Sequence, residues 1–109
     1  MDLTELRKNL VEGTKLPVAY RSFEATRAPD TPFIVYYVVE RNDEQADDSV
    51  YVKNSSVNVE LYFAQKDLKL EEKLESVLQG MGIVFKVFES SIEEEKMLLR
   101  TYEFDLMEE

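Results

Sequence analysis

Hydrophobic and polar residues alternate strictly between positions 57 and 63. The apolar positions are Val57, Val59, Leu61 and Phe63, and the positions between them are Asn58, Glu60 and Tyr62. A period of two is the pattern of a strand with one buried face, because successive side chains point to opposite sides of a sheet. This segment therefore predicts a half-buried strand whose inward face carries Leu61.

Other segments rich in β-branched and aromatic residues predict further strands at 16–20, 33–39, 83–88 and 97–106, with a short apolar triplet at 50–52. Pro17 indicates an edge or entry position for the first strand, because proline cannot donate a ladder hydrogen bond. Segment 33–39 is apolar on both faces. We expect it to be central, with helix on one side and another layer, such as a second subunit, on the other.

Two segments predict helices. Asp2 and Glu5 form a capping-box pattern ahead of a helically spaced stripe of leucines, and Gly13 is the expected stop. Asp67 is the expected N-cap of the second helix, which should end at Gly80 and Gly82. Its apolar stripe is Leu70, Leu74, Val77, Leu78 and Met81, and the residues expected to face water are Glu71, Glu72, Lys73, Glu75 and Gln79.

The order of these elements predicts the fold class. Helix, about three strands, helix and two strands give the order α-β-β-β-α-β-β over a single domain, 1–109. Short links between strands favour an antiparallel or mixed sheet with both helices packed on one face. We therefore expect an α+β protein with one core.

Residues 40–49 are polar and strongly acidic, which predicts a long hairpin loop after strand 33–39. Its carboxylates are Glu40, Asp43, Glu44, Asp47 and Asp48. Several carboxylates on one loop could hold a hard cation such as calcium, but the order of ligands and the turn glycine of an EF-hand are missing. A solvated, like-charged hairpin tip is the favoured interpretation.

Residue types that are missing limit the chemistry. The chain has no cysteine and no histidine, which removes disulfides, thiolate nucleophiles, imidazole bases and ordinary zinc sites. No serine lies in a Gly-x-Ser-x-Gly motif, and the three glycines form no phosphate-binding loop. We therefore predict a protein without catalytic residues, cofactor or metal. The alternative hypothesis is an enzyme that uses carboxylates and tyrosines. It would require two observations, a divalent ion bound at 40–48 and measurable hydrolase turnover.

The charge balance bears on partners. There are 13 basic and 23 acidic residues, for a formal net charge of −10. This sign repels nucleic acid and anionic lipid, so we expect no sequence-specific nucleic-acid binding. The longest apolar run, 33–39, is too short to span a bilayer, and residues 1–5 lack the pattern of a secretory signal. The expected location is the cytoplasm, away from membranes.

All six tyrosines fall on predicted strands, where aromatic residues on an outer sheet face are frequent in protein interfaces. Tyr36 and Tyr62 are therefore interface candidates, together with the five carboxylates of 40–49. The alternative is that the tyrosines cover their own core.

The chain resembles the small tail-completion, or tail-terminator, proteins of long-tailed phages and of prophages in Gram-positive bacteria. The segments that carry the likeness are 16–23 (LPVAYRSF), 28–37 (APDTPFIVYY), 58–67 (NVELYFAQKD), 70–74 (LEEKL) and 95–104 (EKMLLRTYEF). The resemblance implies a sheet flanked by helices and a structural role without catalytic residues. It also implies a homo-oligomeric ring, typically of six copies, that caps the tail tube and joins it to the head connector.

Under this resemblance the protein would be found in the host cytoplasm during assembly and then in the virion, at the tail or the head-tail junction. The acidic segment 40–49 would form an arm toward the ring lumen or a neighbouring component. The competing hypothesis is a small acidic adaptor or inhibitor, without catalytic activity, that occupies a basic site on another protein.

Overall fold

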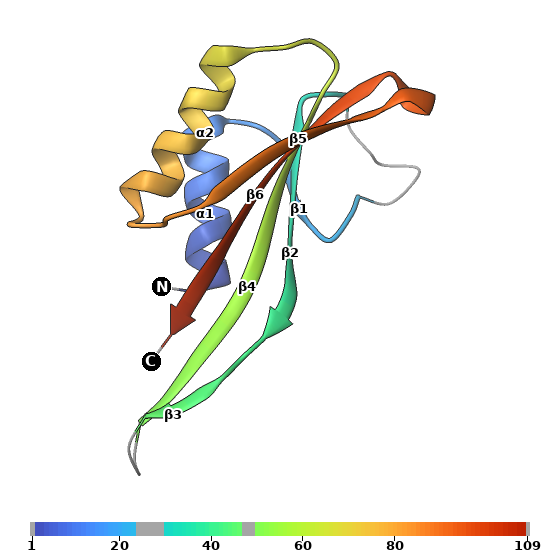
Figure 1. Cartoon of the computed structure of the whole chain (residues 1–109). Helices are drawn as coiled ribbons and strands as arrows, with labels where there is room; N and C mark the ends of the chain where they lie inside the picture. The colour runs from blue at the N-terminus through green and yellow to red at the C-terminus, as the bar shows by residue number, and fades with distance from the viewer. Residues whose placement is uncertain (1, 24–29, 47–49, 109) are drawn as a thin grey trace.

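The computed structural model describes residues 2–23, 30–46 and 50–108, the side chains of 44–46 and 50–51 excepted. Five strands form a mixed sheet in the order β1-β2-β4-β6-β5, with β1 parallel to β2 and the other neighbours antiparallel (Figure 1). The bounds are α1 Leu3–Thr14, β1 Val18–Tyr20, β2 Phe33–Arg41, β3 Glu44–Ala46, β4 Val50–Phe63, α2 Leu68–Gly80, β5 Lys86–Ile92, the 3₁₀ turn η1 Glu93–Glu95 and β6 Met97–Glu108. The α+β class and its element order are confirmed, with β3 as a short extra strand paired to β4.

Helix α1 begins where its sequence predicts. Asp2 is the N-cap, and its carboxylate accepts a hydrogen bond from the backbone N–H of Glu5 at 2.8 Å. The stop expected at Gly13 is wrong by one residue. The helix runs to Thr14, and Lys15 then leaves it in a left-handed conformation with φ 62°.

Gly13 instead allows the two helices to approach closely. A Cβ atom placed on Gly13 would lie 2.2 Å from Cγ2 of Val77 in α2. Any larger residue would have to push the helices apart or move Val77. Glycine is therefore the residue that this close packing of the helices requires.

Helix α2 has the N-cap that the sequence predicts, since Oδ1 of Asp67 accepts a hydrogen bond from the N–H of Leu70 at 3.1 Å. The expectation that Glu71 faces water is wrong. Its side chain turns toward the sheet, and the residue is 5% exposed. The physical reason is a compensating cation, because Nε of Arg100 in β6 lies 3.3 Å from Oε1 of Glu71.

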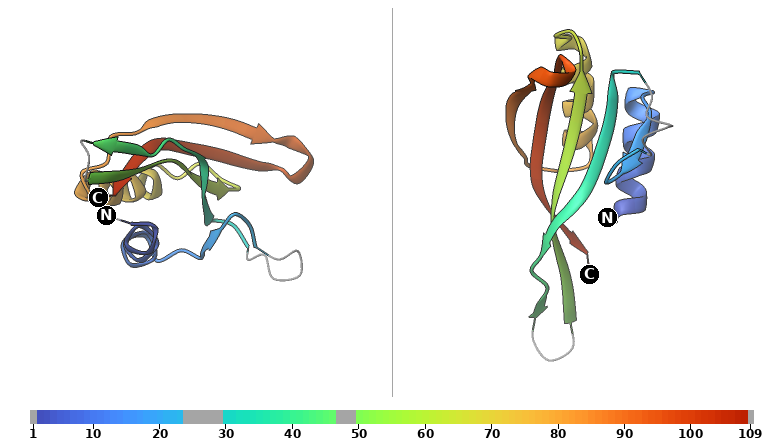
Figure 2. Two further views of the ribbon diagram at one scale, coloured as in Figure 1. Left: turned by 90° about the horizontal axis from the view of Figure 1, so that it is seen from below. Right: turned by 90° about the vertical axis from the view of Figure 1, so that its right-hand side faces the viewer.

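Both helices cover the same face of the sheet (Figure 2). Leu6 and Leu10 of α1 and Leu74 and Leu78 of α2 are all 0% exposed. The strand residues packed in this core are Val18, Ile34, Tyr36, Val57, Val59, Leu61, Phe63, Tyr102, Phe104 and Leu106. The predicted inward face of segment 57–63 is therefore confirmed.

Strand β4 is longer than predicted and the acidic loop is shorter. The segments expected at 50–52 and from Val57 form one strand of 14 residues. Strand β2 extends through Arg41, and β3 pairs Glu44 with Val52 and Ala46 with Val50. Polar residues enter the ladder here because β4 offers them backbone partners. Of the expected loop, 47–49 lie outside the described residues.

The edges of the sheet are β1 and β5, which confirms the edge position expected from Pro17. Strand β5 begins at Lys86, later than the predicted 83–88. The reason is that the chain is still closing α2 at Ile83, whose N–H donates to the carbonyl of Leu78 at 3.0 Å. No helix among the described residues is long and apolar enough to cross a membrane.

Leu61→Asp should unfold the protein, because Leu61 is 1% exposed and the substitution buries an unpaired carboxylate. We expect a loss above about 4 kcal/mol, enough to abolish the cooperative thermal transition in circular dichroism. Leu68→Asp is the matched control, because Leu68 is 65% exposed at the start of α2, where a carboxylate is favourable. A cooperatively folded Leu61→Asp protein would show that the covered face is misassigned.

Gly13→Ala should lower the free energy of unfolding in urea by about 1–3 kcal/mol, because the new methyl group meets Val77. The roughly 0.5–1 kcal/mol helix advantage of alanine is too small to offset a contact this close. Adding Val77→Ala should recover much of the loss. Gly80→Ala is the control, since no atom lies within 4 Å of its added Cβ. Equal effects of the two glycine substitutions would contradict the helix contact.

Candidate functional site

The face of the sheet opposite the helices, here called the open face, carries no helix in the described part of the chain (Figure 2). Its residues are Phe33, Val35, Tyr37 and Glu40 of β2; Ser56, Asn58, Glu60 and Tyr62 of β4; Lys86 and Phe88 of β5; and Leu99, Thr101, Glu103 and Asp105 of β6. Val35 is 4% exposed although it lies outside the core under the helices. The open face therefore has packed side chains of its own.

Aromatic rings provide part of that packing. Phe33 stacks on Tyr62 with ring centres 4.9 Å apart, and Phe23 meets Phe33 edge to face at 5.3 Å. These contacts lie at the Phe33–Tyr62 pair of the open face, while Phe88 on β5 is 50% exposed. The open face thus offers both ordered rings and an exposed apolar side chain.

Glu60 lies at the centre of the open face between two tyrosines. The hydroxyl of Tyr37 donates to Oε2 at 3.0 Å, and the hydroxyl of Tyr62 donates to Oε1 at 3.1 Å. Asn58 in turn donates from Nδ2 to the hydroxyl of Tyr37 at 3.3 Å. Among the described residues no lysine or arginine pairs with Glu60. Its carboxylate keeps lone pairs for a further donor.

The two hydroxyls remain donors over the ordinary pH range. Burial raises the pKa of Tyr62 to about 12, and the adjacent charge of Glu60 contributes because it disfavours a phenolate. Burial also raises the pKa of Tyr37, against the opposing hydrogen bond from Asn58. Both rings therefore keep their protons and donate them in hydrogen bonds to Glu60.

The charge of the open face is negative. Its carboxylates belong to Glu40, Glu60, Glu103 and Asp105, and its described cationic side chain is that of Lys86, which lies opposite Glu103 across the β5–β6 ladder. Such a surface attracts basic groups and repels a second surface of the same kind.

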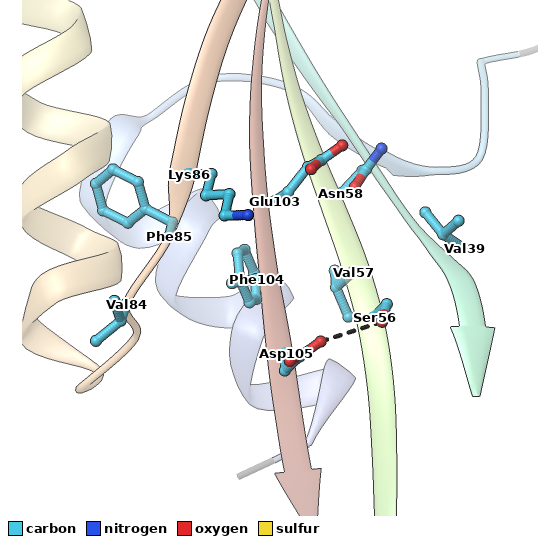
Figure 3. A pocket seen from close by; sticks show the side chains of 10 residues that line it. All are labelled: Val39, Ser56, Val57, Asn58, Val84, Phe85, Lys86, Glu103, Phe104 and Asp105. Atoms are coloured by element: carbon cyan, nitrogen blue, oxygen red, sulfur yellow. Dashed lines mark hydrogen bonds between the residues drawn. The ribbon is translucent and has the colours of Figure 1, made fainter. Parts of the chain in front are cut away.

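A shallow hollow of about 390 Å³ lies where β5 separates from β6 (Figure 3). Pairing between these strands ends at Lys86 and Glu103, which leaves Asp105 without a β5 neighbour. Asp105 accepts a hydrogen bond from the hydroxyl of Ser56 at 3.1 Å. A carboxylate alone activates a hydroxyl poorly, so this arrangement is better suited to binding than to catalysis.

Carboxylates on the helix-covered side are arranged differently. The Arg100 guanidinium lies 2.9 Å from Glu89 and 3.2 Å from Glu75, and its Nε also donates to the hydroxyl of Tyr102 at 2.8 Å. Lys66 pairs with Glu89 and lies 2.8 Å from Glu71. These contacts lower the pKa of Glu89, with the Lys66 hydrogen bond as the main cause. This cluster joins α2, β5 and β6 and has a structural role.

The hairpin of β3 and the start of β4, here called the arm, projects beyond the body of the protein (Figure 1). The last pair between β4 and β6 is Lys53 with Glu108, so β3 pairs with β4 beyond the reach of β6. Asp43 closes the base of the arm. It pairs with Arg41, and its Oδ1 accepts a hydrogen bond from the N–H of Asn54 at 3.1 Å.

The interface candidates predicted from the sequence therefore lie in different parts of the structure. Tyr36 lies under the helices, is 5% exposed and contacts Tyr20 edge to face at 5.2 Å, so it is a core residue of this chain. Tyr62 and the exposed Glu40 lie on the open face, and Asp43 is held in the base of the arm. The backbone of Glu44 lies in β3, whereas Asp47 and Asp48 lie outside the described residues.

No group of three or more acidic residues suited to hold a metal ion is present in the described part of the chain. Sequence reasoning missed Glu60, Tyr37 and Glu103 as members of one surface. The alternation around Val57 places Glu60 on the outward face, but only the strand register brings Tyr37 beside it. That register links residues 23 positions apart.

Tyr62→Phe should weaken the open face and change its response to alkali. Loss of the hydroxyl that donates to Glu60 should lower the free energy of unfolding, measured in urea near neutral pH, by about 1 kcal/mol. Because the folded pKa is raised, the contribution of Tyr62 is complete below about pH 10 and is lost as pH rises through about 12. The variant should therefore lose stability less steeply between pH 10 and 12. Tyr20→Phe is the control. If Tyr62→Phe left the loss of stability between pH 10 and 12 as steep as in the wild type, that result would contradict the contact between Tyr62 and Glu60.

Comparisons with known proteins add no family to this description. No model of a known protein family matches the chain, and no curated protein matches its sequence. The open face, the arm and the chemistry of their residues are therefore the features that bear on function.

Proposed function

We propose that this protein is a structural subunit of virion assembly, which forms a ring that terminates the phage tail tube and joins it to the head connector. The observation that carries the proposal is the arm, a paired ribbon that extends past the end of β6. The molecule measures 51 × 27 × 22 Å along its principal axes, and the arm lies along the long one (Figure 1). A projecting ribbon can reach a neighbour that the body does not touch.

The rest of the chain contributes little to the stability of the arm. A two-stranded hairpin alone is marginally stable in water, and β3 has β4 as its described strand partner. Contact with a second protein would bury this ribbon and stabilise it. We take this as support for a role in which the arm engages a neighbouring subunit or the tail tube.

The open face supports the same proposal. A ring subunit must offer surface to its neighbours, and this face combines aromatic packing with uncovered strands. The net charge of −10 would let DNA pass through a ring lumen without adhering to it. Neither feature requires a catalytic residue.

The second candidate function is a small acidic adaptor or inhibitor that binds a basic site on another protein. The open face has an excess of carboxylates, among them those of Glu60, Glu103 and Asp105, and this excess favours the alternative. It predicts a monomer that ignores tail tubes and binds a basic protein with a steep dependence on salt.

Shortening the arm should abolish tube capping without unfolding the protein. Residues 44–52 can be replaced by Asn-Gly, so that Asp43 and Lys53 flank a two-residue turn. The β4–β6 pairing and the Asp43 contact with Asn54 remain, so the thermal midpoint should change little. We expect the wild type, and not the shortened variant, to form caps on purified tail tubes in electron micrographs and to increase in mass by light scattering.

Replacing the carboxylates of the arm by amides distinguishes the contribution of its length from that of its negative charge. The variant Glu44→Gln, Asp47→Asn, Asp48→Asn keeps the ribbon and removes three carboxylates. Capping that survives this variant but not the shortening would assign the role to the ribbon itself. A wild type that stays monomeric and ignores tubes at every concentration would refute the assembly role in favour of the adaptor.

A further inference from the structure

We infer that the open face binds a second copy of this chain through a surface on α1 and β1. This surface, here called the α1 flank, consists of Arg7, Lys8, Val11, Tyr20 and Arg21. The inference rests on the proposed function, from which it takes the identity of the partner. It adds which two surfaces meet at each contact between subunits.

The α1 flank is basic and partly apolar. Arg7, Lys8 and Arg21 are exposed, and the guanidinium carbon of Arg21 lies 5.9 Å from the ring centre of Tyr20. Val11 is 38% exposed and Tyr20 42%. Arg7 and Val11 are four residues apart, so they share one stripe of α1 beside the buried leucines.

A hollow of about 480 Å³ lies on this flank between α1 and β2. Its lining combines apolar Leu3, Val11 and Tyr36 with basic Arg7 and Lys8, with Thr4 and with one acidic residue, Glu12. An apolar side chain at the rim of an acidic surface would suit such a hollow. Phe88 is one, since it is 50% exposed on the open face in the row of Thr101 and Glu60.

Charge complementarity selects this pairing over a symmetric one. Two open faces placed against each other would oppose Glu60, Glu103 and Asp105 with the same carboxylates, which is unfavourable. The α1 flank instead brings guanidinium and ammonium groups to those carboxylates. Glu60 has hydroxyl donors but no described cation, so an arginine of the neighbour would complete its partners.

The positions of the two surfaces allow the contact to repeat. The α1 flank lies on the helix side of the sheet and the open face lies on the other (Figure 2). One copy can therefore engage two neighbours at once, one through each surface. A head-to-tail contact of this kind closes into a ring or extends as a filament, depending on the rotation between copies.

Zero-length cross-linking tests the contact even where association is weak. An equal mixture of natural and ¹⁵N-labelled protein is treated with a water-soluble carbodiimide, which joins lysine amines to carboxylates. We expect peptides of mixed isotope that join Lys8 to Glu103 or Asp105. Lys8 belongs to α1, which lies on one side of the sheet, and the register of β6 places Glu103 and Asp105 on the other, so the mixed species reports contact between copies. Cross-links confined to other pairs, or none between copies, would overturn the inference.

Charge reversal provides the matched variants. Arg7→Glu with Lys8→Glu changes the α1 flank, and Glu103→Lys with Asp105→Lys changes the open face. Each protein alone should lose the increase in mass that wild type shows on tail tubes, while an equimolar mixture should regain it, because each reversed surface then meets an opposite charge. A mixture that stays inactive while both variants keep the wild-type thermal midpoint would overturn the pairing.

The two proposals can fail separately. If tubes are capped but the cross-links join other surfaces, the contact is wrong and the assembly role stands. If Lys8 is joined to the open face in free protein while tubes are ignored, the contact stands and the tail role is wrong.

Discussion

The structure depends on burying one face of one sheet under two helices. Strand β4 lies in the middle of that sheet, and its alternate residues from Val57 to Phe63 meet α1 and α2. Each of these side chains is worth about 1.5–3 kcal/mol when removed from water, so this layer is the main stabilising element. The helices can share it because Gly13 lets α1 come close to Val77 of α2.

The same constraint creates the open face. A domain of this size has enough apolar residues for one packed layer, and both helices are used on one side. The opposite side must then be stabilised by its own side chains. Phe33 and Tyr62 stack there, and Tyr37 and Tyr62 hold Glu60 by hydrogen bonds. The result is an ordered face that no helix of the described residues covers.

Carboxylates have different partners on the two faces of the sheet. Beneath the helices, Glu71 is 5% exposed, and Arg100 and Lys66 neutralise it because an unpaired buried charge would cost several kcal/mol. On the open face, Glu60 has neutral donors, so its charge remains uncompensated within the described residues. Negative charge on one side and basic residues on the α1 flank give the molecule the polarity on which the proposed head-to-tail contact rests. This polarity and the projecting arm are consistent with an assembly subunit.

Local periodicity and composition were enough to predict several features of the protein. Alternation around Leu61 identified the buried face, Asp2 and Asp67 marked the helix starts, and the missing cysteine and histidine narrowed the possible chemistry. Features that depend on partners distant in sequence are established only in the folded chain. Examples are the register that sets Tyr37 beside Glu60, the cation that lets Glu71 turn inward, and the helix contact at Gly13. Local patterns show which face of an element is apolar, but they do not show which residue of another element lies opposite, because that depends on how the backbones pair and pack.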